Sequence, residues 1–249
     1  MGTGTGYPEG ATALVTGAGS GIGESVAAML VAAGCRVVCA GRRMARLEAL
    51  AAKLGAHARA LELDVDDAAS VASIGERLPA GWRDIEILVN NAGHDKGGRR
   101  RFDEGSAEQW AAIIETNVTG LIRVTRAIIP GMVERDRGHV VNIGSVAGLN
   151  AYATGTIYAA SKHAVHGFSE SLRLDFAGTG IRVTEILPGL VRTEFALNRW
   201  QDEARAQQFY DDFGSCLDPQ DIARAVLFAL EQPPHVVVSQ LVVVPSAQR

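Results

Sequence analysis

The chain has 249 residues, of which 24 are Lys or Arg and 28 are Asp or Glu, so its formal net charge at pH 7 is −4. A mildly acidic chain lacks the basic surface that nucleic acid selects, so nucleic acid is not an expected partner. Three cysteines without zinc-type spacing indicate neither a disulfide framework nor a metal site. No apolar run approaches the roughly 18 residues of a membrane span, and the first ten residues show no signal-peptide pattern, so we expect a cytoplasmic protein without a membrane partner.

Short apolar runs alternate along the chain with longer amphipathic stretches, which is typical of a parallel sheet covered by helices. Near-continuous hydrophobic runs of this kind suit strands that are buried on both faces. We predict one Rossmann-like, doubly wound α/β/α domain over residues 11–249 with a seven-stranded, mainly parallel sheet, preceded by a flexible tail at residues 1–10. The predicted strands are 12–16, 36–40, 58–63, 85–90, 139–143, 182–187 and 236–244.

Two helical patterns follow the fourth predicted strand. Apolar residues recur at i, i+3 and i+4 from Trp110 to Ile128, and the polar Asn117 falls on the same inward stripe. A second stripe with several small residues runs from Ile157 to Leu172. Residues 193–217 hold aromatic side chains but little periodicity, and we interpret them as a helical lid whose aromatic residues serve either substrate contact or plain packing.

A glycine-rich turn directly follows the first predicted strand and precedes a helical pattern. Such a turn lets the backbone approach a pyrophosphate, whose charge is met by free N–H groups and the helix dipole. A tight turn without a ligand is the simpler reading. The spacing is Gly-x-x-x-Gly-x-Gly, and the candidate coenzyme contacts in it are Gly17, Ser20, Gly21, Ile22 and Gly23.

The second predicted strand ends at Gly41, where a coenzyme site selective for NAD usually has a carboxylate for the ribose 2′-hydroxyl. Arg42 and Arg43 follow instead, and guanidinium groups suit a 2′-phosphate. A solvated basic start to a surface helix is the alternative reading. The pattern favours NADP(H) over NAD(H).

Ser145 follows the fifth predicted strand, and Tyr158 and Lys162 share one helix face at i, i+4 spacing. A tyrosine ordinarily titrates near pKa 10, so proton exchange at neutral pH requires an adjacent cation, which Lys162 can supply. Ser145 could hydrogen-bond a substrate oxygen beside the tyrosine hydroxyl. By itself, Tyr-x-x-x-Lys is also a common helix pair.

Taken together, these motifs resemble the single-domain short-chain dehydrogenase/reductases over residues 11–244. The resemblance implies a catalytic tetrad of Asn117, Ser145, Tyr158 and Lys162, in which Lys162 lowers the tyrosine pKa and Asn117 positions a water. It also implies further coenzyme contacts: Asp64 and Val65 at the adenine; Tyr158 and Lys162 themselves; Asn91, Ala92 and Gly93 beside the coenzyme; and Pro188, Gly189, Val191 and Thr193 in a nicotinamide-side loop.

Within the family, the chain is similar to the NADP-dependent 3-hydroxy acid and serine dehydrogenases. It departs from them at His94-Asp95-Lys96 and at the basic run Arg99-Arg100-Arg101, which reads as a solvated loop, an anion contact or a partner-subunit contact. The substrate residues we expect are His94, Lys96, Arg192 and Trp200. His163 and His166 lack metal-ligand spacing, so we expect surface or interface histidines and no metal.

The resemblance implies an NADP-dependent oxidoreductase that interconverts a secondary alcohol, favoured as a small 3-hydroxy acid, and its carbonyl. The alternatives are a reductase of a 3-oxoacyl thioester or neutral ketone, and a non-catalytic NADP(H)-sensing regulatory protein. It also implies a homotetramer, or a homodimer, that uses the helical regions 106–135 and 155–177 as its contact surface.

Overall fold

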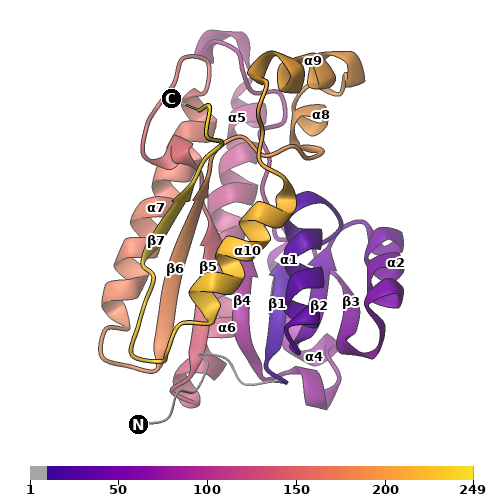
Figure 1. The fold of residues 1–249 in the computed structure, drawn as a ribbon, viewed down its shortest axis with the longest axis vertical. Coiled ribbons are helices and arrows are strands. Elements are labelled where there is room, and N and C mark those ends of the chain that lie inside the picture. Colours follow the sequence, from indigo (N-terminus) through magenta and orange to yellow (C-terminus); the bar gives the residue numbers. More distant parts are fainter. Residues whose placement is uncertain (1–9, 249) are drawn as a thin grey trace.

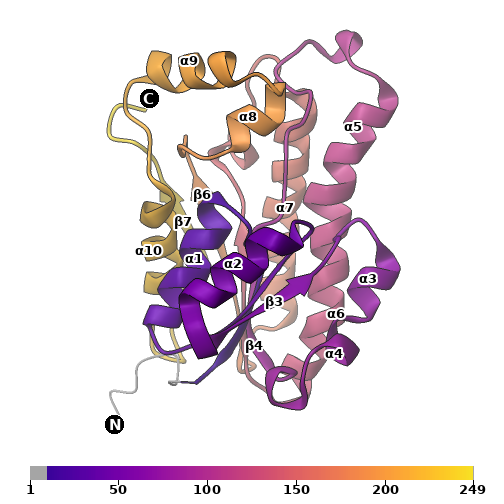
Figure 2. The ribbon, with the colours of Figure 1, turned by 90° about the vertical axis from the view of Figure 1, so that its right-hand side faces the viewer.

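In the computed structural model, which describes residues 10–248, seven strands form one sheet in the order β3-β2-β1-β4-β5-β6-β7 (Figures 1 and 2). Every neighbouring pair is parallel, so the sheet is wholly rather than mainly parallel. This confirms the predicted Rossmann-like α/β fold. The strands are β1 (Thr12–Thr16), β2 (Arg36–Gly41), β3 (Ala58–Glu62), β4 (Ile85–Asn90), β5 (Gly138–Ile143), β6 (Ile181–Pro188) and β7 (Gln240–Val243).

The α-helices connect consecutive strands or follow the last inner strand. They are α1 (Gly21–Ala32), α2 (Met44–Leu54), α3 (Ala68–Ala72), α4 (Ile74–Arg77), α5 (Ala107–Ile114), α6 (Leu121–Glu134), α7 (Thr156–Asp175), α8 (Phe195–Trp200), α9 (Glu203–Phe213) and α10 (Pro219–Leu230). Local signals fix several starts: Ser106 and Gln109 form a capping box at α5, and Asp218 with Asp221 does the same at α10.

Two apolar clusters lie on opposite faces of the sheet. Helices α1, α2 and α10 pack on one face, and α6 and α7 pack on the other (Figure 2). Strands β1, β5 and β6 are buried at every position, as their continuous apolar sequences predicted. Because all the strands are parallel, their carboxyl ends meet at one edge of the sheet, which α8 and α9 overlie (Figure 1).

The structure differs from the predicted elements at two places. The seventh strand spans four residues instead of nine, because only 240–243 pair with β6 at this sheet edge. The long helix after β4 is divided by a π-helical turn at Glu115–Gly120.

Most of the tail expected at residues 1–10 lies outside the described residues; Gly10, which is described, donates its N–H to the Gly34 carbonyl at 3.0 Å. Over residues 10–248, no helix is long and apolar enough to cross a membrane.

Candidate active site

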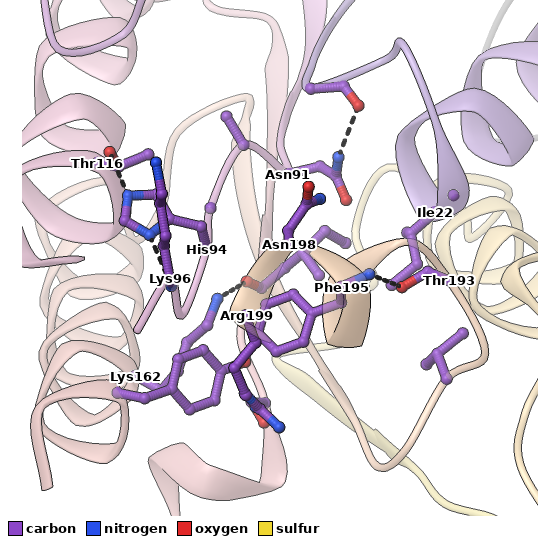
Figure 3. Close-up of a pocket in the computed structure, with 18 of the residues that line it drawn as sticks. Ile22, Asn91, His94, Lys96, Thr116, Lys162, Thr193, Phe195, Asn198 and Arg199 are labelled. Carbon is purple, nitrogen blue, oxygen red and sulfur yellow. Dashed lines mark hydrogen bonds between the residues drawn. The ribbon is translucent and has the colours of Figure 1, made fainter. Parts of the chain in front are cut away.

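A cleft of about 1650 Å³ opens along the carboxyl edge of the sheet, between the strand ends and the α8–α9 segment. It collects residues from the glycine turn, from the loops after β2 to β6, and from α7 and α8. Figure 3 shows Phe195, Asn198 and Arg199 of α8 across from the loop that carries His94 and Lys96. Of the coenzyme contacts expected from the sequence, all except Gly23 line this cleft.

The glycine turn has the backbone conformation that its sequence demands. Gly17 and Gly21 have φ angles of +65° and +59°, a region that side chains rarely adopt. A Cβ on Gly23 would lie 2.5 Å from the Gly17 carbonyl oxygen, so Gly23 permits close packing rather than ligand contact. Ser20 precedes α1 without making a side-chain cap, which leaves first-turn N–H groups available to an anion.

The arginines after β2 border the same end of the cleft. Arg43 donates to Ser20 Oγ at 2.6 Å and pairs with Glu194 at 2.8 Å, and Arg46 pairs with the other oxygen of Glu194 at 2.6 Å. Arg42 makes no ion pair within 4 Å among the described residues. At this end of the cleft, the Arg42 guanidinium therefore has no ion-pair partner among the described residues, and the Arg43 guanidinium is paired with Glu194.

The segment after β4 is fixed to the first strand. Asn91 donates through Nδ2 to the Thr16 carbonyl at 3.0 Å, and Thr16 Oγ1 accepts from the Ala92 N–H at 3.0 Å. Figure 3 shows Asn91 directed toward the glycine turn. The segment at 91–93 and the turn at 17–23 thus form one rigid wall of the cleft.

Ser145, Tyr158 and Lys162 meet in the inner part of the cleft, as the sequence predicted. Lys162 is 8% exposed, and its Nζ donates to the Ile143 carbonyl at 2.8 Å at the end of β5. That nitrogen lies 5.9 Å from the centre of the Tyr158 ring. Ser145 Oγ accepts the Ala147 N–H at 3.1 Å. A proton donor, a hydroxyl and a cation therefore share one site.

Burial is the largest influence on the pKa of both groups, and the lowering of the tyrosine pKa by Lys162 that the resemblance implied stays a prediction. Burial raises the pKa of Tyr158 above its ordinary value, as do the nearby Tyr152 and Asp95, while a hydrogen bond with Ser145 opposes them. Burial lowers the pKa of Lys162 to about 8, and the charge of Glu185 partly offsets this. Loss of hydration outweighs charge attraction here because both groups are enclosed.

Asn117 lies in the π-helical turn and does not line the cleft. Its Nδ2 donates to the His94 carbonyl and to Ser161 Oγ, both at 3.0 Å, and its Oδ1 accepts the His94 N–H at 2.8 Å. The amide therefore holds the His94 backbone from behind the wall. The water contact that the family resemblance implied for Asn117 stays a prediction.

Four sites were expected to contact substrate. His94, Lys96 and Trp200 line the cleft, and His94 Nε2 lies 3.1 Å from Thr116 Oγ1 (Figure 3). Arg192 does not: its guanidinium stacks 4.9 Å from the centre of the Tyr210 ring and lies 3.8 Å from Asp211. These contacts hold the Arg192 side chain against α9, outside the residues that line the cleft, and its contact with a substrate carboxylate stays a prediction.

Comparison with known proteins gives consistent matches along the chain. A family model described as short chain dehydrogenase matches residues 11–204. The chain belongs to the short chain dehydrogenase family. An NADP-dependent 3-hydroxy acid dehydrogenase of Salmonella typhi is 45% identical over 237 residues, which is 94% of this chain and 95% of that protein. One of Schizosaccharomyces pombe is 37% identical over 246 residues, 96% of this chain and 94% of that protein.

A solved structure described as the closed form of serine dehydrogenase complexed with NADP+ matches this short chain dehydrogenase with a TM-score of 0.92 at 42% identity, covering 96% of each chain. The seven-stranded fold and its connections are therefore those of the family.

Sequence reasoning missed a buried ion pair in this short chain dehydrogenase. Arg199 of α8 lies 2.8 Å from Asp95, and the two side chains are only 5% and 1% exposed. Burial raises the pKa of Asp95, and Arg199 counteracts that rise. The sequence marked Asp95 as unusual, but residues 104 positions apart carry no signal that they meet.

Three contacts of aromatic rings were also missed. The Tyr158 and Phe195 rings lie edge to face, with their centres 5.5 Å apart. The Arg99 guanidinium lies 4.7 Å from the centre of the Tyr152 ring and 5.6 Å from that of Phe209. Through these contacts α8 packs on Tyr158 of α7, and α9 packs on Arg99, which also contacts Tyr152.

Proposed function

We propose that this chain is an NADP(H)-dependent oxidoreductase that interconverts a small 3-hydroxy acid and its carbonyl product by hydride transfer. The observation that carries the proposal is one continuous cleft, which begins at an anion-binding glycine turn beside Arg42 and Arg43 and ends at Ser145, Tyr158 and Lys162. The relatives in Salmonella typhi and Schizosaccharomyces pombe are NADP-dependent 3-hydroxy acid dehydrogenases, which supports both the coenzyme and the substrate class.

The residues present fit a dinucleotide with a 2′-phosphate. The left-handed glycines and the uncapped start of α1 suit a pyrophosphate, and Arg42 offers a cation with no protein partner among the described residues. Bound NADP(H) supplies the hydride, or accepts it, during turnover. The residues that would hold it are those of the glycine turn and Arg42 and Arg43, with Asp64, Val65, Asn91, Ala92, Gly93, Pro188, Gly189, Val191 and Thr193 along the cleft.

Ser145 and Tyr158 carry the proton chemistry. The Ser145 hydroxyl accepts the Ala147 N–H at 3.1 Å and donates to the Pro188 carbonyl at 3.5 Å, a long hydrogen bond that a substrate carbonyl oxygen would replace when Ser145 polarises it. In reduction, the Tyr158 hydroxyl gives its proton to that oxygen as an alcohol forms, and in oxidation the phenolate removes the proton. The Lys162 cation stabilises the phenolate left behind, and the phenol is restored by a proton from solvent.

The charge at the substrate end favours an anionic substrate. Lys96, Arg99 and Arg100 line the cleft, and none of them makes an ion pair within 4 Å among the described residues. Arg199 is neutralised by Asp95 and is therefore less available. A carboxylate on the substrate could form an ion pair with one of these three cations.

Two alternative functions predict different outcomes in one experiment. The purified protein is assayed with NADP+ and NAD+ on 3-hydroxy acids and neutral alcohols, and with NADPH on aldehydes, 3-oxoacyl thioesters and ketones. The proposal expects the highest kcat/KM with NADP+ and a short 3-hydroxy acid. A preference for thioesters or neutral ketones would identify the alternative reductase, and tight NADPH binding without turnover in any assay would identify a sensing protein.

We also propose a homotetrameric, cytoplasmic enzyme in which residues 193–217 serve as the lid of a single catalytic domain. The regions expected to form the contact surface leave large apolar side chains exposed: Ile122 and Val133 on α6 and Leu174 on α7 are 42%, 48% and 64% exposed. Light scattering at micromolar concentration should give the tetramer mass. The mass of a dimer would mean that only one of the two helical surfaces forms a subunit contact. The mass of a monomer would contradict the proposal.

A further inference from the structure

Glu185 is a fully buried carboxylate in the middle of β6, and the chemistry described so far does not use it. Its residue is 0% exposed. His166 on α7 approaches it with Nδ1 2.7 Å from Oε2. The second oxygen, Oε1, has no hydrogen-bond partner among the described residues. A buried carboxylate with one free oxygen is costly unless a positive charge lies nearby.

Lys162 is bound at the same strand end that this carboxylate lies against. Oε1 occupies the space that a side chain at Gly144 would fill, so only glycine fits at this position of the chain. Gly144 follows Ile143, whose carbonyl accepts the Lys162 ammonium at 2.8 Å, and precedes Ser145. The carboxylate therefore stands directly behind the strand end that positions both the lysine and the serine.

The charged groups that face Glu185 all come from α7. They are Lys162 and His166, which lower the pKa of Glu185, and Glu170, which raises it; burial is the larger effect and leaves that pKa above its ordinary value. Glu170 is 3.8 Å from His166 Nε2 and its side chain is 55% exposed. Strand β5 and the residue after it place the uncharged Asn142, which is the register partner of Glu185, and Gly144 beside it, and β7 presents the uncharged Gln240 amide, 3.2 Å from His166 Nδ1.

We propose that Glu185, anchored by His166, is a positioning residue: the buried counterion that keeps Lys162 protonated and held against the end of β5. The assignment rests on the proposed function only in that Lys162 serves proton transfer there. Glu185 touches neither substrate nor coenzyme. Its effect reaches the tyrosine through the charge and orientation of the lysine.

The direction of the effect is fixed by charge. A negative Glu185 favours the ammonium form and raises the pKa of Lys162 toward its ordinary value. Removing that charge should therefore lower the Lys162 midpoint. The ammonium, and with it the activity that depends on it, would be lost at a lower pH.

The chain allows a direct measurement, because Lys53, Lys96 and Lys162 are its three lysines. In protein with 13C-labelled lysine and no added coenzyme, NMR should resolve three Cε signals, of which that of Lys162 has a midpoint near 8. Glu185→Gln keeps the shape and removes the charge, and should move only the Lys162 midpoint downward. Glu170→Gln is the matched control, since it removes an exposed carboxylate beside the same histidine, and should move nothing.

The alkaline limb of the kcat profile of the NADP-loaded enzyme should shift by the same amount in Glu185→Gln and stay in place in Glu170→Gln. His166→Leu, which removes the anchor and lets the buried Glu185 take up a proton, should lower the midpoint in the same direction; it is decisive if Glu185→Gln does not fold. An unchanged Lys162 midpoint in the folded variants would overturn the inference. A shifted midpoint in a protein that turns over no substrate would overturn the proposed function and leave this inference standing.

Discussion

Burial, and to a lesser degree Tyr152 and Asp95, raise the pKa of Tyr158 and outweigh Ser145 and Arg199, which lower it, so the neutral phenol is favoured. A neutral phenol is the form that donates a proton to a carbonyl. Replacing Tyr158 by Phe removes this proton and keeps the ring that contacts Phe195. Turnover should fall by at least about 10²-fold, the usual contribution of a positioned acid or base. Coenzyme titration by fluorescence should show nearly unchanged affinity; near-normal turnover would exclude Tyr158 as the donor.

Arg99 is the cation best placed to test substrate charge. It lines the cleft, has a left-handed φ of +59°, and rests on the Tyr152 and Phe209 rings without an ion-pair partner among the described residues. Arg99→Gln should raise KM for a 3-hydroxy acid by about fivefold, which corresponds to about 1 kcal/mol for an exposed pair. KM for the methyl ester of the same acid should change little.

Arg101→Gln provides the control for that comparison. Arg101 lies two residues away, pairs with Asp103 at 3.1 Å and does not line the cleft. It should alter neither KM. Equal losses on acid and ester in Arg99→Gln would show that the residue supports the loop and does not recognise a carboxylate.

The site was predictable where its chemistry is local in sequence. The glycine turn follows a strand, and Tyr158 and Lys162 are one helical turn apart, so spacing alone brought these groups together. The direction of the Arg192 side chain was not predictable, because it depends on packing against Tyr210 of another element. The Glu185–His166 contact was not predicted, since a charged residue in a buried strand reads as an exception until its partner on another element is known.

At the scale of elements, periodicity found the helix around Asn117 but not its irregularity. The π-helical turn at Glu115–Gly120 contains one residue more than α-helical geometry allows, and this lets α5 and α6 each turn its apolar side inward. No composition rule marks such a turn. The length of the seventh strand was overestimated for a related reason: its apolar sequence continues beyond the residues that pair with β6.

Deleting Val118 tests the role of the π-helical turn. Removal of one residue would rotate α5 by about 100° relative to α6, given 3.6 residues per turn. Trp110 and Ile113, both buried now, would leave the core. The free energy of unfolding should fall by more than about 3 kcal/mol, as for large buried side chains. Val118→Ala keeps the turn and should cost far less; equal urea midpoints for deletion and wild type would contradict this account.

For the whole molecule, acid stability depends on a histidine in the central sheet. His139 on β5 is 0% exposed, and burial holds its pKa well below the ordinary value. Because the unfolded chain binds this proton more readily, the contribution is present above about pH 6.5 and is lost as the pH falls. Between pH 7 and pH 5 the loss should approach about 2 kcal/mol.

His139→Val should flatten that part of the stability curve, measured by urea unfolding at each pH. Thr184, whose hydroxyl lies 2.7 Å from His139 Nε2, also donates to the Val238 carbonyl at 2.7 Å and so retains a partner in the variant. A slope equal to that of the wild type would assign the acid sensitivity to other groups.

Glu194 binds Arg43 and Arg46 from the first residues of the α8–α9 segment, with these side chains 35%, 45% and 50% exposed. A coenzyme 2′-phosphate would compete with this carboxylate for Arg43, so added salt has two opposing effects on coenzyme affinity. It screens the attraction of the phosphate and also loosens the internal competitor, since exposed pairs weaken over a Debye length of about 10 Å at 0.1 M. The wild-type Kd for NADP+ should therefore vary little with ionic strength, whereas Glu194→Gln should bind more tightly at low salt and lose affinity more steeply as salt is added. In this way an internal anion would buffer the enzyme against changes in the ionic strength of its surroundings.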